Sequence, residues 1–287
     1  MRRLVGAIVA IGFGIVAVGL LVEWIVRHRM NQDRVYCTDN LRQLAQFTDQ
    51  RAKPDGVKPS METMAIPAGT VLNPALPPDQ RLSWVVELLP TFDQRRQETS
   101  TLLVQFDRQQ AWDGPANAKP SRTILPTLNC YGNTVRAPNG EPAFTQYVGS
   151  GGVGENAPNA VGVPFPFAPG GGGPVVYPLG SGCFHYNSPT PFLAIADGLS
   201  ETILFAEIST NVGPWIRGGP STIRTLDPRP EALAPLGVGG QFGGNHANGA
   251  NFGFADYSVR FLTDRIEPNV LRRLFTIAGD GSEVPSD

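Results

Sequence analysis

The residues best suited to chemistry are three cysteines and a C-terminal segment that carries a histidine and an aspartate. Cys37, Cys130 and Cys183 stand far apart, and their spacing fits no zinc-binding motif. His246 and Asp256, with nine residues between them, could form a catalytic dyad or a site for a cation or a polar ligand. Along one extended strand, however, they would lie roughly 30 Å apart. We therefore predict a structural hairpin in which Asp256 accepts hydrogen bonds from turn amides.

A set of carboxylates leaves a cation site open as an alternative. Asp197, Glu201, Glu207 and Asp256 could ligate calcium if the fold brings them together, although their spacing resembles no calcium-binding loop. The structural interpretation is that Asp197, followed by glycine, starts a turn, and that His246 and Asn251 bond neighbouring backbone. The motifs of serine hydrolases and zinc proteases are absent from the sequence. We predict no catalytic residue, no metal and no cofactor.

The elements that position these residues begin with an apolar segment. Residues 4–22 contain no charged side chain, and such a run is long enough to span a hydrocarbon core of about 30 Å. A cleaved signal peptide is the alternative, but residues 27–30 (RHRM) offer no small-residue cleavage site. Residues 1–30 are therefore predicted to be a single-pass transmembrane anchor. Arginines on both sides nearly balance, so charge leaves its orientation open.

The predicted helix continues past the anchor, over residues 31–53. Apolar and small residues recur there at spacings of three and four, with polar residues between them. Such a stripe must be covered by another part of the protein. Its members are Cys37, Leu41, Leu44, Ala45 and Thr48.

Residues 54–287 are predicted to form a mainly β domain with long loops. Glycine (33) and proline (27) make up about a fifth of the 287 residues, which favours short strands and many turns. The net charge of −2 gives no reason to expect a nucleic-acid partner. A long loop is predicted over residues 149–182, and its glycine run at 170–173 lacks the lysine of a phosphate loop. Helices are expected at residues 82–92 and 270–274, and strands at residues 122–130, 143–148, 203–207, 251–254 and 259–262.

Four separated segments together resemble the pilin-like domain-of-unknown-function family 1559 of planctomycete-type bacteria. Residues 37–44 (CTDNLRQL) are similar to the stretch that follows that family's membrane helix, and residues 83–90 (SWVVELLP) to its Ser-Trp helix. Residues 195–204 (IADGLSETIL) and 246–262 match its Asp-Gly segment and its C-terminal signature of a histidine, nine residues and Asp-Gly. The sequence departs from the family at Tyr257, where the signature has glycine, so the hairpin is expected to use a loop longer than two residues. It also lacks the glutamate five residues into the apolar run that prepilin processing requires, because Glu23 lies near the far end.

The resemblance implies an α+β, pilin-like fold: a long N-terminal helix packed on a mainly antiparallel sheet. It also implies export of the C-terminal domain from the inner (cytoplasmic) membrane, and it places Cys37 and Cys130 where the family has cysteines, so we expect them to form a disulfide. The expected protein is a membrane-anchored, pseudopilin-like structural or surface protein without enzymatic activity. Its expected partners are the lipid bilayer and like subunits or secretion and pilus-type components. An exported glycan- or solute-binding module is the alternative, and a membrane-anchored hydrolase the third reading.

Overall fold

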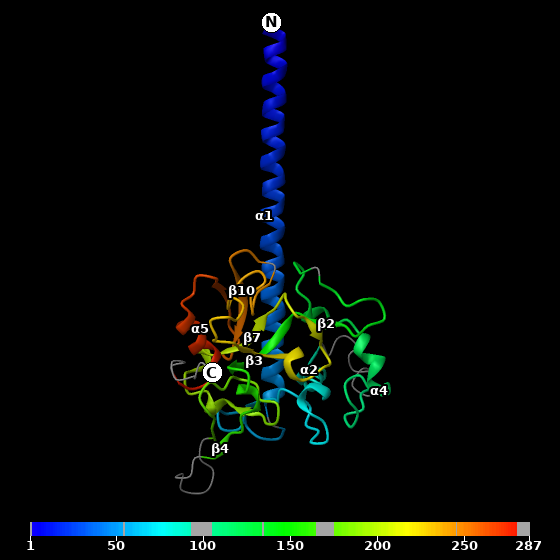
Figure 1. Ribbon diagram of the computed structural model, residues 1–287, viewed down its shortest axis with the longest axis vertical. Coiled ribbons are helices and arrows are strands. Elements are labelled where there is room, and N and C mark those ends of the chain that lie inside the picture. Colours follow the sequence, from blue (N-terminus) through cyan, green and yellow to red (C-terminus); the bar gives the residue numbers. More distant parts are fainter. Residues whose placement is uncertain are drawn as a thin grey trace.

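A long N-terminal helix and a globular α+β domain make up the protein (Figure 1). The computed structural model describes residues 2–53, 55–92, 105–133, 135–164, 175–244 and 246–279, with side chains from residue 12 onward. Helix α1 covers Arg2–Ala52 without interruption. Its N-terminal part projects away from the domain, whereas its C-terminal part lies within the domain (Figure 1). The predicted long helix is confirmed.

The projecting part of α1 carries large apolar side chains that no other described part of the chain covers. Phe13, Ile15, Leu20 and Trp24 are each more than half exposed. Within the residues that the structure describes, no helix combines the length and the apolar character that crossing a membrane requires.

The second half of α1 is buried along the stripe that the sequence predicts. Cys37, Leu41, Leu44, Ala45 and Thr48 are all fully buried. The helix packs mainly on strand β10 (Gly249–Phe254), and both run in the same direction. Thr38 contacts Asn251 near the start of this strand, and Asp49 accepts a hydrogen bond from Tyr257 just beyond its end. The amphipathic pattern therefore has the sheet as its partner.

A sheet of five strands forms the centre of the domain, in the order β11-β10-β7-β3-β9. β10 pairs antiparallel with β11 (Val259–Thr263) and with β7 (Ile203–Glu207). β7 pairs antiparallel with β3 (Tyr147–Val153). β9 (Ile223–Leu226) adds one parallel pair at the edge, next to β3. The prediction of a mainly antiparallel sheet is thus confirmed, with one parallel exception.

Both faces of the sheet are covered. One face packs against α1 and α2 (Trp84–Leu88), around the aromatic group of Trp84, Phe184 and Phe205. The opposite face packs against α5 (Pro268–Phe275), where Phe252 and Phe275 meet edge to face. Because the strands are buried on both sides, β3, β7 and β10 show no exposed positions.

Short elements complete the domain. The predicted helix at 82–92 is present but shorter, and begins with Ser83 capping the amide of Val85. Three two-stranded pairs lie outside the main sheet. They are β1 (Ala65–Ile66) with β6 (Thr190–Pro191), β2 (Phe144–Thr145) with β8 (Gly213–Pro214), and β4 (Val163–Pro164) with β5 (Val175–Val176). A short helix, α4, covers Pro115–Ala118. The 3-10 turns are Pro78–Gln80, Pro120–Arg122, Pro126–Leu128, Ala157–Asn159, Phe192–Ala194, Leu199–Glu201 and Gly219–Ser221.

Two predicted elements are wrong. Residues 122–130 form no strand; they contain the end of one 3-10 turn and the whole of another. Each turn has proline at its first position. Proline favours a turn over a strand there because its fixed backbone angle suits the turn and it has no amide hydrogen to donate to a sheet. The loop predicted from residue 149 onward begins too early, since β3 runs on to Val153. The glycine run at 170–173 lies outside the described residues.

Glycines in β3 let the chain pass where a side chain could not fit. A Cβ on Gly149 would collide with the ring of Phe184. Gly152 has a φ of +101°, and a Cβ there would meet the backbone of residues 180–182. The glycines that favoured a loop prediction are therefore required by close packing within a strand.

His185 is a fully buried histidine near this strand and gives the fold a specific pH dependence. Its Nδ1 lies 2.8 Å from Thr190 Oγ1, its ring stacks on Tyr177, and its Nε2 has no partner among the described residues. Burial lowers the pKa of His185 from 6.5 to about 4. Between these values the unfolded chain binds the proton and the folded one does not, so stability decreases as the pH falls from 6.5 to 4.

We expect this histidine to remove about 2–3 kcal/mol of unfolding free energy over that interval. Full-length protein in detergent micelles, unfolded by denaturant at a series of pH values, measures the loss. The control is His185→Gln, which cannot take up the proton and should show a flatter profile between pH 6.5 and 4. Identical slopes for the two proteins would contradict the assignment.

Candidate functional site

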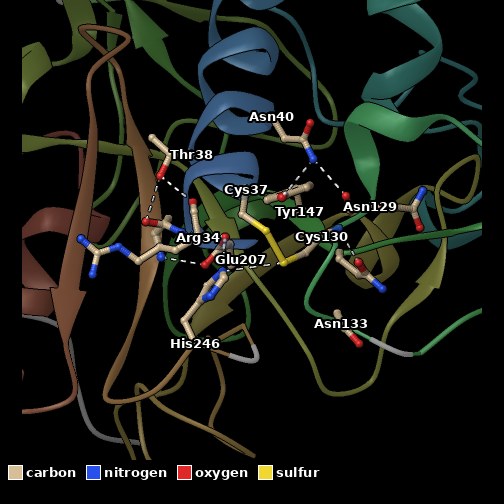
Figure 2. Close-up of a disulfide and its surroundings, with 12 residues drawn as sticks. Arg34, Cys37, Thr38, Asn40, Asn129, Cys130, Asn133, Tyr147, Glu207 and His246 are labelled. Carbon is tan, nitrogen blue, oxygen red and sulfur yellow. Dashed lines mark hydrogen bonds and ion pairs between the residues drawn. A yellow bond between two sulfur atoms is a disulfide. The ribbon is translucent and has the colours of Figure 1, made fainter. Parts of the chain in front are cut away.

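The predicted disulfide between Cys37 and Cys130 is present. Cys37 lies on the buried face of α1, and Cys130 follows the 3-10 turn Pro126–Leu128. Their Cα atoms are 5.3 Å apart, and 93 positions separate them in sequence. The bond joins the long helix covalently to the domain (Figure 2), and Cys37 is the first buried residue of the described part of the helix.

Glu207 and His246 lie beside this disulfide. Glu207 is the last residue of β7, and His246 lies just before β10. His246 Nε2 is 3.5 Å from Glu207 Oε1 and 3.7 Å from Cys130 Sγ. Both side chains are almost completely buried, with exposed fractions of 1% for Glu207 and 5% for His246. Figure 2 shows both pointing toward the sulfur atoms.

Asn251 holds the carboxylate in place. Its backbone amide donates to Glu207 Oε2 at 2.7 Å, and its side-chain Nδ2 donates to Oε1 at 3.0 Å. The pairing of β10 with β7 sets Phe252 opposite Ala206, and so brings Asn251 next to Glu207. Thr38, one residue after Cys37, connects this pair to α1, because its hydroxyl lies 3.4 Å from Asn251 Oδ1. The sequence predicted that His246 and Asn251 bond neighbouring backbone. In the structure the Asn251 side chain instead contacts the side chains of Glu207 and Thr38, and His246 contacts those of Glu207 and Cys130, so Asn251 positions a buried acid.

Polar contacts also fix the opposite side of the disulfide. The amide of Cys130 donates to Gln146 Oε1 at 2.6 Å. Asn40, one turn after Cys37, donates to the carbonyl of Asn129 and to the hydroxyl of Tyr147 (Figure 2). Burial, and secondarily the carboxylate of Glu207, raises the pKa of Tyr147 well above 10. Its phenol therefore stays protonated and serves as a hydrogen-bonding group.

The other predicted residues lie elsewhere. Within the described part of the chain, one group of three or more cysteine, histidine and acidic side chains comes close enough to share an ion, namely Cys37, Cys130, Glu207 and His246. Asp197, Glu201 and Asp256 do not belong to it, so the calcium site considered from the sequence does not form there.

Asp256 and Asp197 each accept hydrogen bonds that stabilise a turn or a neighbouring segment. Asp256 accepts hydrogen bonds from the amide and hydroxyl of Ser258, as predicted for a turn residue. The turn is longer than two residues, and Tyr257 takes a φ of +68° in it. Asp197 accepts from Gly279 and Thr276, which fastens the segment after α5 to the turn before β7. Burial raises the pKa of Asp197.

Cys183 is the unpaired cysteine of the chain. It is fully buried, and burial raises the pKa of its thiol. A protonated, enclosed thiol is a poor nucleophile, so Cys183 acts as a small core residue.

Two hollows on the surface are separate from this cluster. One is lined by residues of the segments 153–160, 178–181 and 225–229, and the other by residues of 122–144 together with Tyr36. Both are open to solvent. Neither contains a member of the cysteine, histidine and glutamate cluster.

Fold and site together define a class: α+β proteins in which a long N-terminal helix is fastened by a disulfide to a sheet covered on both faces. Within it, the chain belongs to the family described as "Protein of unknown function (DUF1559)", whose model matches residues 60–223, more than half of the sequence. This confirms the family resemblance. The match includes Cys130 and Glu207 and ends before His246. Neither the curated proteins nor the solved structures contain a significant match.

Proposed function

We propose that the protein is a membrane-anchored, exported, pseudopilin-like structural or surface protein without enzymatic activity. The observation that carries this proposal is the division of α1 into two parts. One part projects from the domain with exposed apolar side chains, and the other forms part of the domain core. The apolar run of the sequence begins at Leu4, ahead of the described side chains. A helix built in this way can hold a folded domain at a bilayer surface.

The disulfide supports export. Disulfides persist in oxidising compartments outside the cytoplasm and are rare inside it. The bond between Cys37 and Cys130 is buried where the helix packs against the domain, and it makes the anchor and the domain one covalent unit. A rigid connection of this kind suits a protein whose role is to present or assemble a domain.

The absence of enzymatic activity is supported by the burial of the reactive side chains and by the bonds that they already make. Cys37, Cys130, Glu207 and His246 are enclosed and bonded to one another or to neighbouring residues. All four side chains are buried, so none is presented to a substrate at the surface that the structure describes.

Fractionation of cells that make the full-length protein tests the proposal. We expect the protein in the membrane pellet after an alkaline carbonate wash. We also expect external protease to digest the domain in cells whose inner membrane is left intact. A variant lacking residues 1–30 should move to the soluble fraction. Full-length protein recovered quantitatively from the soluble cytosol would refute the proposal.

The mature N-terminus separates two forms of the proposal. If peptide sequencing begins at Met1, the helix is an uncleaved signal anchor. If it begins within residues 4–22, the protein is processed as a pilin, and association with like subunits through the projecting helix becomes the favoured role. We expect Met1, because the glutamate that prepilin processing requires is missing at the fifth position of the apolar run.

A further inference from the structure

The cluster around the disulfide contains four side chains whose donor atoms converge on one point. Two sulfurs, one imidazole nitrogen and one carboxylate oxygen all lie within 4.8 Å of one another. They come from α1, from the segment after a 3-10 turn, from β7 and from the segment before β10. All four residues are buried, which is typical of structural metal sites and excludes competing water.

The donor set suits one metal in particular. Two thiolates, an imidazole and a carboxylate are the ligand types that hold Zn²⁺ with tetrahedral geometry. At the usual bond lengths, neighbouring ligand atoms of a tetrahedral zinc site lie about 3.3–3.8 Å apart. His246 Nε2 is 3.5 Å from Glu207 Oε1 and 3.7 Å from Cys130 Sγ. Two edges of the tetrahedron are therefore present already.

Two of the four donor residues, Glu207 and Cys130, are held by outer contacts of the kind found around metal sites. Asn251 fixes both oxygens of Glu207, and Gln146 binds the amide of Cys130. Such outer contacts hold ligands in the orientation that a metal needs. The missing feature is a pair of separate sulfurs, because a disulfide supplies no thiolate.

We propose that the reduced form of this protein binds one Zn²⁺ ion through Cys37, Cys130, His246 and Glu207, and that zinc binding and the disulfide exclude each other. A dithiol reductant breaks the S–S bond, forms its own disulfide and leaves its two protons on the two cysteine sulfurs. Zn²⁺ then forms two Zn–S bonds and releases both protons to solvent. In either state α1 is fastened to the sheet at the same place, by a covalent bond or by a metal.

The test uses full-length protein in detergent, reduced with excess dithiol and freed of it by gel filtration without oxygen. Co²⁺ is the probe, because tetrahedral thiolate coordination gives it a sulfur-to-metal charge-transfer band and intense visible bands. We expect one Co²⁺ per chain with these bands, displaced by one equivalent of Zn²⁺. The oxidised protein should show none of them.

Matched variants locate the site. Cys183→Ala should bind as the wild type does, whereas the double variant Cys37→Ala/Cys130→Ala should lose the charge-transfer band. His246→Ala, whose fold can be verified in the disulfide form, should weaken Zn²⁺ binding by more than the roughly 10–100-fold that loss of an outer contact costs. The same bands in the oxidised protein, or unchanged affinity in His246→Ala, would overturn the proposal.

Reduction could also unfold the chain, and the test remains decisive in that case. Zinc binding to a folded site stabilises that fold, so Zn²⁺ should restore a cooperative thermal transition to the reduced protein. A reduced chain that neither refolds with Zn²⁺ nor gives the cobalt bands does not contain this site.

Discussion

Replacing both Cys37 and Cys130 by alanine is expected to lower the free energy of unfolding by about 4–5 kcal/mol, because the disulfide closes a long loop. The bond spans 93 positions, so it removes much of the conformational freedom of the unfolded chain. The dependence of stability on denaturant should become steeper at the same time, since an unfolded chain without the crosslink exposes more surface. Denaturant unfolding of the full-length protein in detergent, followed by circular dichroism, measures both quantities.

The control for this prediction is Cys183→Ala. It removes a buried sulfur without opening a loop, so it should cost about 1 kcal/mol and leave the denaturant dependence unchanged. The helix itself should remain docked in the double variant, because Leu41 and Leu44 are still buried and Asn40 still bonds Asn129. A double variant that differs from the wild type by no more than Cys183→Ala does would show that the crosslink contributes little.

The helix and the central strands could be predicted from the sequence because their signals are local. The stripe from Cys37 to Thr48 has the period of a helix, and every one of its members is buried. Strand β7 matches its predicted bounds, and β10 and β11 were predicted to within two residues. Each of these segments is a short apolar run that favours a buried strand wherever it lies.

The elements that were missed depend on contacts between distant residues. β9 is a strand because β3 offers it a parallel edge, and four residues alone do not specify that partner. The glycines at 149–152 are typical of a loop, and only the proximity of Phe184 and the backbone of residues 180–182 explains why a strand needs them.

The candidate site likewise combines features that the sequence predicted with features that depend on contacts between distant residues. The cysteine pair was predicted through the family resemblance, and Glu207 and His246 were each recognised as candidates. Their convergence was not predicted, because it requires the register of β10 on β7 and the docking of α1 on β10. The sequence did predict that His246 and Asp256 form no dyad, and the structure places them at opposite ends of β10.

Glu207→Ala is expected to lower the free energy of unfolding by about 3–5 kcal/mol, because it removes the buried acceptor of two hydrogen bonds. The amide and the side chain of Asn251 would lose their acceptor, and His246 would lose its only acidic neighbour in the cluster. Each buried donor left without a partner costs about 1–3 kcal/mol. Unfolding by denaturant under non-reducing conditions keeps the disulfide intact, so the measured loss belongs to the carboxylate alone.

Glu207→Gln separates the loss of charge from the loss of shape. The amide keeps an oxygen for one donor of Asn251 but turns an N–H toward another donor, so we expect an intermediate cost of about 1–2 kcal/mol. Combining Glu207→Ala with His246→Ala closes a double-mutant cycle, and because the two side chains are in contact, their coupling energy should lie between about 0.5 and 3 kcal/mol. If glutamine at position 207 costs nothing while alanine destabilises the protein, and the cycle gives no coupling, the side chain only fills space. A measurable coupling would instead mean that the folded domain keeps His246 and Glu207 beside the sulfurs as one interacting unit.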